Sequence, residues 1–123
     1  MDTGNDFNQS SALAQHWVDA WNLHDLAAIM QHYSENIEFR SPVIQKMGVH
    51  PEGIINNKEE LKAYFEKALV KYPDLYFELF HILEGVNSMV IFYKSISDSL
   101  AAEYMELDRQ GKICKVSAHY KGL

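Results

Sequence analysis

The sequence predicts one α+β domain in which helices pack on one face of a mostly antiparallel sheet. Apolar residues recur with a helical period at three places before residue 73, and four runs typical of strands follow in the second half of the chain. No helical pattern separates these four runs, so we expect them to pair in chain order as a meander. The length of 123 residues also fits a single domain.

Residues 1–9 are polar and are expected to form a disordered tail before a single domain over residues 10–123. Ser10 or Ser11 can cap the first helix. Its apolar face is formed by Leu13, Ala14, Trp17, Val18 and Trp21. A second short helix is expected to begin at Asp25. Its apolar residues are Leu26, Ile29, Met30 and Tyr33.

The middle of the chain predicts a strand, a long loop and a third helix. Residues 37–41 alternate and stop at a proline, which is typical of a strand end. Residues 42–56 contain two prolines, two glycines and no clear period, so we expect a loop that gates a nearby site. Asn57 and Glu60 have capping-box spacing and open a helix that Pro73 ends.

Four strands are expected after this helix, at residues 75–84, 89–95, 100–108 and 113–120. Gly111 can supply the positive φ that a short hairpin needs between the last two. Some of these strands are apolar on both faces, notably at Tyr76, Phe80 and Ile82. Because the helices cover one face only, we expect the other face of the sheet to form a homodimer.

Composition and charge exclude several classes of protein. A hydrophobic content of 47% argues against disorder, and no apolar run is long enough to span a membrane. All of the net charge of -6 arises before Arg40, which argues against a basic nucleic-acid-binding arm and a secretory signal. The single cysteine fits a reducing compartment, and we expect a cytoplasmic protein. Metal-binding and nucleotide-binding motifs are absent, so no cofactor is expected.

Strand alternation singles out Glu103, which shares a face with Ala101, Met105 and Leu107. The apolar face of the last strand carries Cys114, Val116, Ala118 and Tyr120. If the row of Glu103 faces inward, burial raises the pKa of its carboxyl and makes it a candidate acid, base or hydrogen-bond donor. The alternative is that Glu103 lies at the sheet margin or pairs across a dimer interface.

Small residues near Glu103 leave room for a pocket between the sheet and the helices. The predicted ligand-binding residues are Trp17, Trp21, Tyr33, Phe39, Ser41, Met105, Val116, Ala118 and Tyr120. The alternative is that the aromatic side chains only fill the core. His119 lies on the polar side of its strand, although twist at the chain end could bring it to the pocket rim as a second catalytic group.

Three segments resemble the nuclear transport factor two superfamily, in its SnoaL-like and ketosteroid-isomerase-like branch. They read WNLHDLAAIMQHYSENIEFRSP, NNKEELKAYFEKAL and ELDRQGKICKVSAHY. The resemblance implies a cone-shaped fold, with three N-terminal helices on a curved sheet that encloses a deep apolar cavity, and dimers through the outer sheet face. It implies no single activity, because this scaffold hosts isomerases, cyclases, epoxide hydrolases, dehydratases and non-catalytic binders.

The resemblance to the isomerases is incomplete at the site. Their catalytic aspartate falls at Ser41, which cannot act as that base, and their oxyanion tyrosine falls at Trp17, whose indole N–H only donates. A supporting tyrosine is retained as Tyr33, whereas another falls at Phe65. The protonated aspartate of their oxyanion hole falls at Glu103, one methylene longer.

Two functions remain open. The first is a dimeric protein that binds a small, mostly apolar, oxygenated or aromatic molecule and transfers a proton without a cofactor, as isomerases, cyclases and dehydratases of this branch do. Glu103 and His119 would be its titratable groups, since SnoaL-type cyclases place an acid or base near the end of the last strand. The second is a non-catalytic ligand-binding or protein-interaction module, which Ser41 in place of the base favours.

Overall fold

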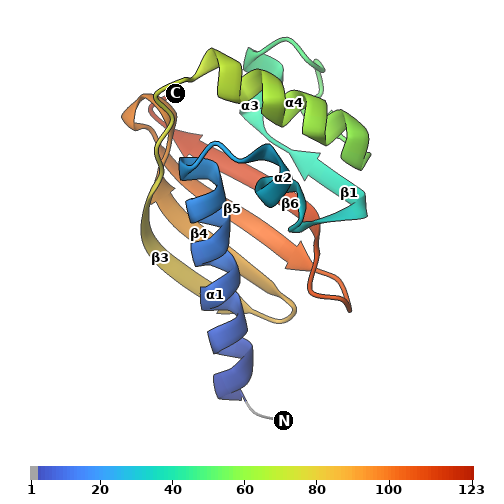
Figure 1. Ribbon diagram of the computed structural model, residues 1–123, viewed down its shortest axis with the longest axis vertical. Coiled ribbons are helices and arrows are strands. Elements are labelled where there is room, and N and C mark those ends of the chain that lie inside the picture. Colours follow the sequence, from blue (N-terminus) through green and yellow to red (C-terminus); the bar gives the residue numbers. More distant parts are fainter. Residues whose placement is uncertain (1–2) are drawn as a thin grey trace.

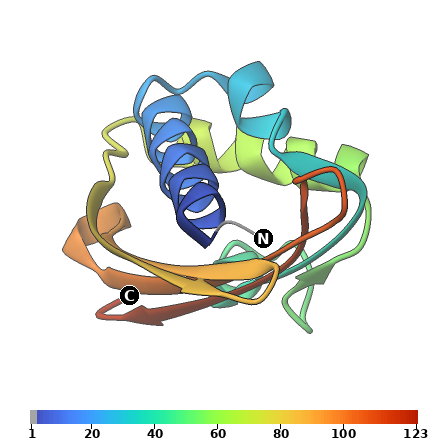
Figure 2. The ribbon, with the colours of Figure 1, turned by 90° about the horizontal axis from the view of Figure 1, so that it is seen from below.

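Six strands form one curved sheet, and helices cover its concave face (Figure 1, Figure 2). The computed structural model describes residues 3–123, with side chains from Ser10 onward. The helices are α1 (Thr3–Asn22), α2 (Leu26–Met30), α3 (Pro42–Lys46) and α4 (Lys58–Lys71), and a 3₁₀ turn, η1, spans Ile96–Asp98. The strands are β1 (Tyr33–Arg40), β2 (Ile54–Ile55), β3 (Glu78–Gly85), β4 (Ser88–Lys94), β5 (Leu100–Leu107) and β6 (Ile113–Lys121).

The strand order is β2-β1-β6-β5-β4-β3. Every neighbouring pair is antiparallel except β1 and β6, which run parallel. The last four strands form the meander that the sequence predicts. In Figure 2, α1 and α4 lie across the concave side of the sheet, where α1 packs on β3 and α4 packs on β1. The α+β architecture is therefore confirmed.

The first helix starts earlier than the sequence predicts. α1 begins at Thr3 rather than after Ser10 or Ser11. Residues 3–9, predicted to be part of a tail, therefore have helical backbone, and residues 1–2 of that predicted tail lie outside the described part of the chain. A helix can extend into a polar segment, because propagation costs less than nucleation. Polarity alone therefore did not locate the helix start.

Tyr33 begins β1 and does not belong to α2, although it continues the helical period. Ile113 donates its N–H to the carbonyl of His32 at 2.8 Å, and Tyr33 then pairs with Ile113. Pairing with β6 thus overrides the local helical pattern, and β1 starts four residues before the predicted strand. Asp25 caps α2 as predicted.

The segment 42–56, predicted to be a long loop, contains α3 and β2 instead. Ser41 caps α3 by accepting a hydrogen bond from the N–H of Val43 at 3.1 Å, and Pro42 takes a first-turn position, where its missing N–H costs nothing. The N–H of Ser41 donates to the carbonyl of Gly53 at 3.0 Å. Elements this short show no readable period. The segment is anchored to the sheet through Ser41 and β2, and its gating role stays a prediction.

α4 has the boundaries that the sequence predicts. The side chain of Asn57 accepts a hydrogen bond from the N–H of Glu60 at 2.8 Å, and the helix ends before Pro73. β4, β5 and β6 match their predicted bounds to within one residue, and Gly111 adopts a φ of 77° in the hairpin turn. Cys114 falls on an irregularity between β5 and β6 and is only half-buried, rather than lying on the core face as predicted.

Residues 72–77 connect α4 to β3 and are held against the end of α1. The Asn22 amide donates to the carbonyl of Phe77 at 3.0 Å and accepts the N–H of Phe77 at 2.7 Å. His24 Nε2 lies 2.8 Å from the carbonyl oxygen of Leu75. These contacts occupy backbone groups that a strand would use, so β3 begins at Glu78, three residues later than predicted.

A bulge in β3 changes which residues lie on the outer sheet face. The pairing shifts between Leu79 and His81, so that Ile82 pairs with Ile91 and packs against the core. The prediction that Tyr76, Phe80 and Ile82 all lie on the outer face is therefore wrong at Ile82. The extra residue in the bulge reverses the sheet face to which each following side chain points. Phe80 is 38% exposed and contacts Phe92, with ring centroids 5.6 Å apart.

Aromatic side chains form much of the core between α1, α4 and the sheet. Trp17 stacks on Phe77 at 5.5 Å, and Trp21 meets Phe65 edge-on at 4.8 Å. Ring pairs at these separations combine a large apolar area with a favourable ring geometry. Within residues 3–123, no helix is both long enough and apolar enough to cross a membrane.

Candidate functional site

Glu103 lies on the concave face of the sheet, near the middle of β5. It pairs with Ile91 of β4 on one side and with Ala118 of β6 on the other, and it is 2% exposed. Ala101 and Met105, the next residues on the same face of β5, are also buried. The inward orientation expected from strand alternation is therefore confirmed, and the alternative of a marginal or interface position is wrong.

The two carboxyl oxygens of Glu103 have different surroundings. The hydroxyl of Tyr93 donates a hydrogen bond to Oε1 at 2.7 Å, whereas Oε2 is buried without any hydrogen-bond partner among the described residues. Burial raises the pKa of Glu103 to about 7, and the hydrogen bond from Tyr93 opposes this rise by stabilising the charged form. Both protonation states are therefore populated near neutral pH.

Four tyrosines from four different elements surround this carboxyl. They are Tyr33 of β1, Tyr64 of α4, Tyr93 of β4 and Tyr120 of β6. Burial raises the pKa of each of their hydroxyls, and the nearby charge of Glu103 raises it further. These hydroxyls stay protonated at neutral pH, so they act as hydrogen-bond partners, and Glu103 is the one group among them that can exchange a proton there.

Strand register explains why Tyr93 and Tyr120 lie on either side of the site. Ala101 pairs with Tyr93 on β4 and with Tyr120 on β6, so the two tyrosines flank a methyl side chain in one row across three strands. Glu103 lies in the next row, about 7 Å further along β5. Tyr93 and Tyr64 were not among the predicted site residues. The alternation of residues along β4 could have placed Tyr93 on the inner face of the sheet.

The predicted pocket residues do lie between the sheet and the helices, but their side chains are tightly packed. Eight of the nine are at most 6% exposed, and Tyr120 is partly buried. The indole N–H of Trp17 donates to the hydroxyl of Tyr33 at 2.9 Å, which fixes both rings beside the site. The aromatic side chains thus fill the core around Glu103, and a ligand must displace some of them.

Ser41 and Trp21 were predicted to contact a ligand, but both make contacts within the protein. Ser41 caps α3, and its hydroxyl also interacts with the hydroxyls of Tyr64 and Tyr120. The indole N–H of Trp21 is buried without a hydrogen-bond partner among the described residues, and its ring packs against Phe65 and Phe77. Trp21 therefore lies in the aromatic layer beneath the helices.

His119 is not brought to Glu103. It is exposed and pairs with Ala102, whose side chain lies on the opposite face of β5 from Glu103. The twist that would carry His119 to the pocket rim is not seen, because Ala118 and Tyr120 keep the inward positions. Glu103 and His119 therefore do not share a site.

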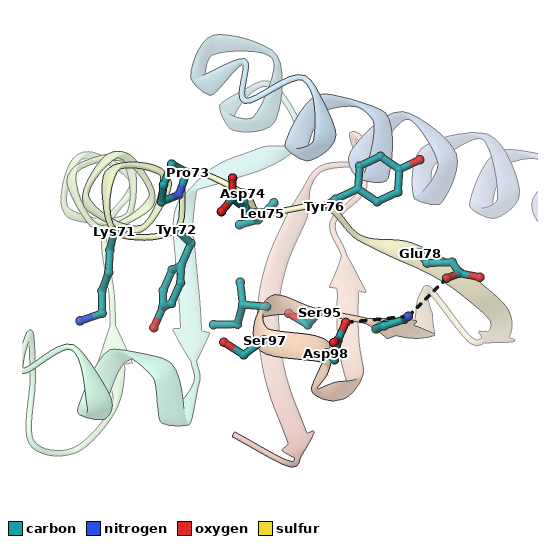
Figure 3. A pocket seen from close by; sticks show the side chains of 12 residues that line it. Lys71, Tyr72, Pro73, Asp74, Leu75, Tyr76, Glu78, Ser95, Ser97 and Asp98 are labelled. Atoms are coloured by element: carbon teal, nitrogen blue, oxygen red, sulfur yellow. Dashed lines mark ion pairs between the residues drawn. The ribbon is translucent and has the colours of Figure 1, made fainter.

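One pocket of about 500 Å³ opens at the end of α4 and is drawn in Figure 3. It lies between the segment 72–77 and the turn η1, and Lys94 spans its edge with ion pairs to Glu78 at 3.8 Å and to Asp98 at 3.9 Å. Its floor includes Ser95, which is 5% exposed. We call this space the η1 pocket.

A second pocket, of about 610 Å³, lies at the other end of the sheet beside the β5–β6 turn. Tyr33 and Lys58 line one side, and Arg109, Gln110 and Lys112 line the other. We call it the hairpin pocket. Among the described residues, no group of three or more His, Cys, Asp or Glu side chains is placed to hold a metal ion.

Comparisons with known proteins agree with this architecture. The SnoaL-like domain family matches residues 14–114. A SnoaL-like protein of unknown function from Burkholderia thailandensis E264 is 37% identical, with a TM-score of 0.89 over 94% of this chain and 96% of that one. No curated protein is significantly similar to the chain.

More distant structures share the fold alone. A protein from Agrobacterium tumefaciens C58, provisionally named an isomerase of the SnoaL-like family, is 21% identical, with a TM-score of 0.74 over 94% of this chain and 99% of that one. A provisionally named ketosteroid isomerase from Kribbella flavida is 15% identical, with a TM-score of 0.73 over 94% of this chain and 80% of that one. The cone-shaped fold implied by the sequence resemblance is thus confirmed.

Proposed function

The chain belongs to the SnoaL-like family, and from this premise we propose that it binds a small, mostly apolar, oxygenated molecule inside the cone. Glu103 then transfers a proton to or from that molecule in a cofactor-free reaction. The observation that carries the proposal is the buried carboxyl with one oxygen held by Tyr93 and the other without a partner. An unsatisfied buried polar atom is costly, so it is a natural contact for a ligand oxygen or a C–H that loses its proton.

The environment of Glu103 favours a ligand with a flat apolar body. Trp17 and Tyr93 lie with ring centroids 5.4 Å apart, and Phe39 and Phe65 also at 5.4 Å. A ligand that displaces some of these rings would gain dispersion contacts and few hydrogen bonds, so a single ligand oxygen would be paired at Glu103 and the remainder would be apolar.

The number of proton-active groups favours one type of reaction. Glu103 is the one group in this cluster whose pKa lies near 7. The surrounding tyrosines stay protonated, and Ser41 occupies the position of the isomerase base, so neither supplies a second proton-transfer group. A single carboxylate can remove a proton and return it to another atom of the same molecule, which is an isomerisation. The provisional isomerase names of two structural relatives agree with this type. Cyclisations and dehydrations that need a separate acid and base fit less well.

The competing function is a binder without catalysis. It is favoured by Ser41, which caps α3 and supplies no base, and by the dense aromatic packing around Glu103. A binder would use the carboxyl only as a hydrogen-bond partner for a ligand oxygen. The two functions therefore differ in whether the carboxyl gives up or accepts a proton while the ligand is bound.

Binding can be tested with 4-nitrophenol, followed by quenching of the two interior tryptophans. Replacement of Glu103 by Gln should weaken binding about tenfold, because a strong hydrogen bond from the buried carboxylic acid to the ligand oxygen is exchanged for a weaker one from an amide. Glu106→Gln is the matched control, since Glu106 accepts from Tyr104 at 2.9 Å on the same strand but on the other face. Equal affinity of both variants and the unaltered protein would overturn the binding site.

Proton transfer can be tested with 2-tetralone, an apolar ketone with an exchangeable C–H. The protein in deuterated buffer should accelerate deuterium incorporation beside the carbonyl, and Glu103→Gln should abolish the acceleration whereas Glu106→Gln keeps it. Binding of the ketone without exchange would favour the non-catalytic function.

A further inference from the structure

Glu103 has no visible access to solvent, so a ligand needs a route through the packed side chains. Two pockets touch residues beside the site: the η1 pocket contains Ser95, and the hairpin pocket contains Tyr33. They lie at opposite ends of the curved sheet, so the structure poses a choice between two routes.

The floor of the η1 pocket is also part of the core. Leu75 and Ile96 are 7% and 8% exposed and belong to the same buried cluster as Trp17 and Tyr93. Ser95 lies two residues beyond Tyr93, directly after the end of β4, and its hydroxyl interacts with that of Tyr120. The floor is therefore about one row of side chains from the tyrosines that flank Glu103, and two rows from Glu103 itself.

The turn that carries Ile96 has strained backbone. Ser97 and Asp98 both have positive φ values, 54° and 58°, in a region that non-glycine residues seldom adopt. Figure 3 shows Ser97 and Asp98 on the pocket side of this turn. Two consecutive residues in this conformation make the turn a local source of strain.

Three hydrogen bonds within the turn hold it closed, one of them from the N–H of Ser99 to the carbonyl of Ile96 at 3.0 Å. The N–H of Ser95 donates to the carbonyl of Ser99 at 2.7 Å, and the Ser99 hydroxyl donates to the carbonyl of Ile96 at 2.7 Å. Asp98 is paired with Lys94 at 3.9 Å, and its side chain is 92% exposed, so this ion pair adds little. All of these hydrogen bonds lie within the turn, so opening it leaves the pairing of Lys94 with Leu100 at the end of β4 and β5 in place.

We propose that the η1 pocket is the outer compartment of the ligand site and that η1 withdraws Ile96 to admit the ligand to Glu103. This inference rests on the proposed function. The pocket presents hydroxyl and charged groups from Ser95, Ser97 and Lys94, whereas the interior is aromatic. The ligand class is accordingly an apolar oxygenated ring that carries a polar substituent, with the ring inside and the substituent left in the η1 pocket.

The hairpin pocket offers a poorer route. Tyr33, its contact with the interior, is 1% exposed, is held by the N–H of Trp17 and begins β1 beside β6. Moving it would disturb strand pairing. Its other walls carry charges such as Lys58, which pairs with Glu35 at 3.6 Å.

Selective modification can distinguish the two routes. In a Cys114→Ser background, Ser97→Cys and Gln110→Cys each place one exposed thiol in the η1 pocket or the hairpin pocket, and each is coupled to a bulky maleimide. Stopped-flow quenching by 4-nitrophenol should show association and dissociation both slowed about tenfold by the label at position 97, with Kd unchanged to within about twofold. The label at position 110 should leave both rates unchanged.

A substitution inside the floor provides a second measurement that does not depend on labelling. Ile96→Ala should speed association and dissociation together, because a smaller side chain blocks the route less. Unchanged rates with the label at position 97, or slowed rates with the label at position 110, would overturn this inference alone. Absence of 4-nitrophenol binding in the unmodified protein would overturn both this inference and the proposed binding site.

Discussion

The hydroxyl of Tyr93 on β4 donates a hydrogen bond to Oε1 of Glu103 on the neighbouring strand β5 at 2.7 Å, and both side chains are almost fully buried. A buried carboxyl without such a donor would be strongly driven to its neutral form. The bond stabilises the ionised form and keeps the pKa of Glu103 near 7 despite burial. Tyr93 thus sets the balance between the acid and base forms.

The first prediction concerns a variant that lacks this donor. Tyr93→Phe should raise the pKa of Glu103 above its value of about 7, because the charged carboxylate loses its hydrogen bond while burial remains. The side-chain carboxyl signal of Glu103, followed by ¹³C NMR as a function of pH, gives this pKa directly. Tyr104→Phe, on the outer face, is the control and should not move it. A pKa lowered by Tyr93→Phe would contradict the assignment of the donor.

The second prediction concerns the dependence of stability on pH. The folded protein holds the Glu103 proton up to about pH 7, whereas the unfolded chain releases it near 4.5, so between these values the folded state binds more protons. The contribution of Glu103 to the free energy of unfolding is therefore greatest below pH 4.5 and is lost as pH rises to 7. The loss is on the order of 3 kcal/mol.

Denaturant unfolding of the unaltered protein and of Glu103→Gln between pH 4.5 and 8 isolates this contribution, because other groups titrate in both. The stability of the unaltered protein relative to the variant should fall with rising pH and level off above 7. A difference that is flat, or that rises with pH, would show that Glu103 titrates normally.

Sequence patterns located Glu103 but not its partner. Alternation in residues 100–108 puts Glu103 on the same face as Ala101 and Met105, and this needs no knowledge of neighbouring strands. Recognising Tyr93 as its donor requires the register between β4 and β5, in which Tyr93 lies opposite Ala101. Register depends on contacts far apart in the sequence, which a single strand does not record.

Irregularities explain the elements that sequence patterns missed. The β3 bulge beside Phe80 turns Ile82 inward, and the short α3 and β2 have too few residues to show a period. The pocket residues were placed on the correct side of the sheet, yet the sequence could not reveal that their rings fill the space. Packing density depends on how side chains interdigitate, and residue type alone does not determine it.

The third prediction concerns the proposed homodimer. The outer face exposes apolar side chains that include Phe80 and Leu83, at 38% and 59%. A second copy of the chain would cover them, and Phe80→Asp would then place a charge in the interface and produce a monomer. Sedimentation equilibrium at micromolar concentration measures the change, with Val86→Asp in the nearby β3–β4 turn as the control. A monomeric unaltered protein would contradict the prediction.

The last prediction compares the two tryptophans, which lie one helical turn apart on α1 and differ in the hydrogen bonding of the indole N–H. Trp17 donates its N–H to Tyr33 at 2.9 Å, whereas the N–H of Trp21 is buried without a partner among the described residues. Replacement of either by Phe removes the same atoms and leaves a similar cavity. Trp17→Phe also leaves the buried hydroxyl of Tyr33 without its donor, which costs about 1 to 3 kcal/mol more, whereas Trp21→Phe relieves an unsatisfied group. Urea unfolding at one pH should therefore find Trp17→Phe the more destabilised of the two variants. Equal losses, or a larger loss for Trp21→Phe, would mean that the Trp17–Tyr33 hydrogen bond contributes little and that packing alone fixes the rings beside Glu103.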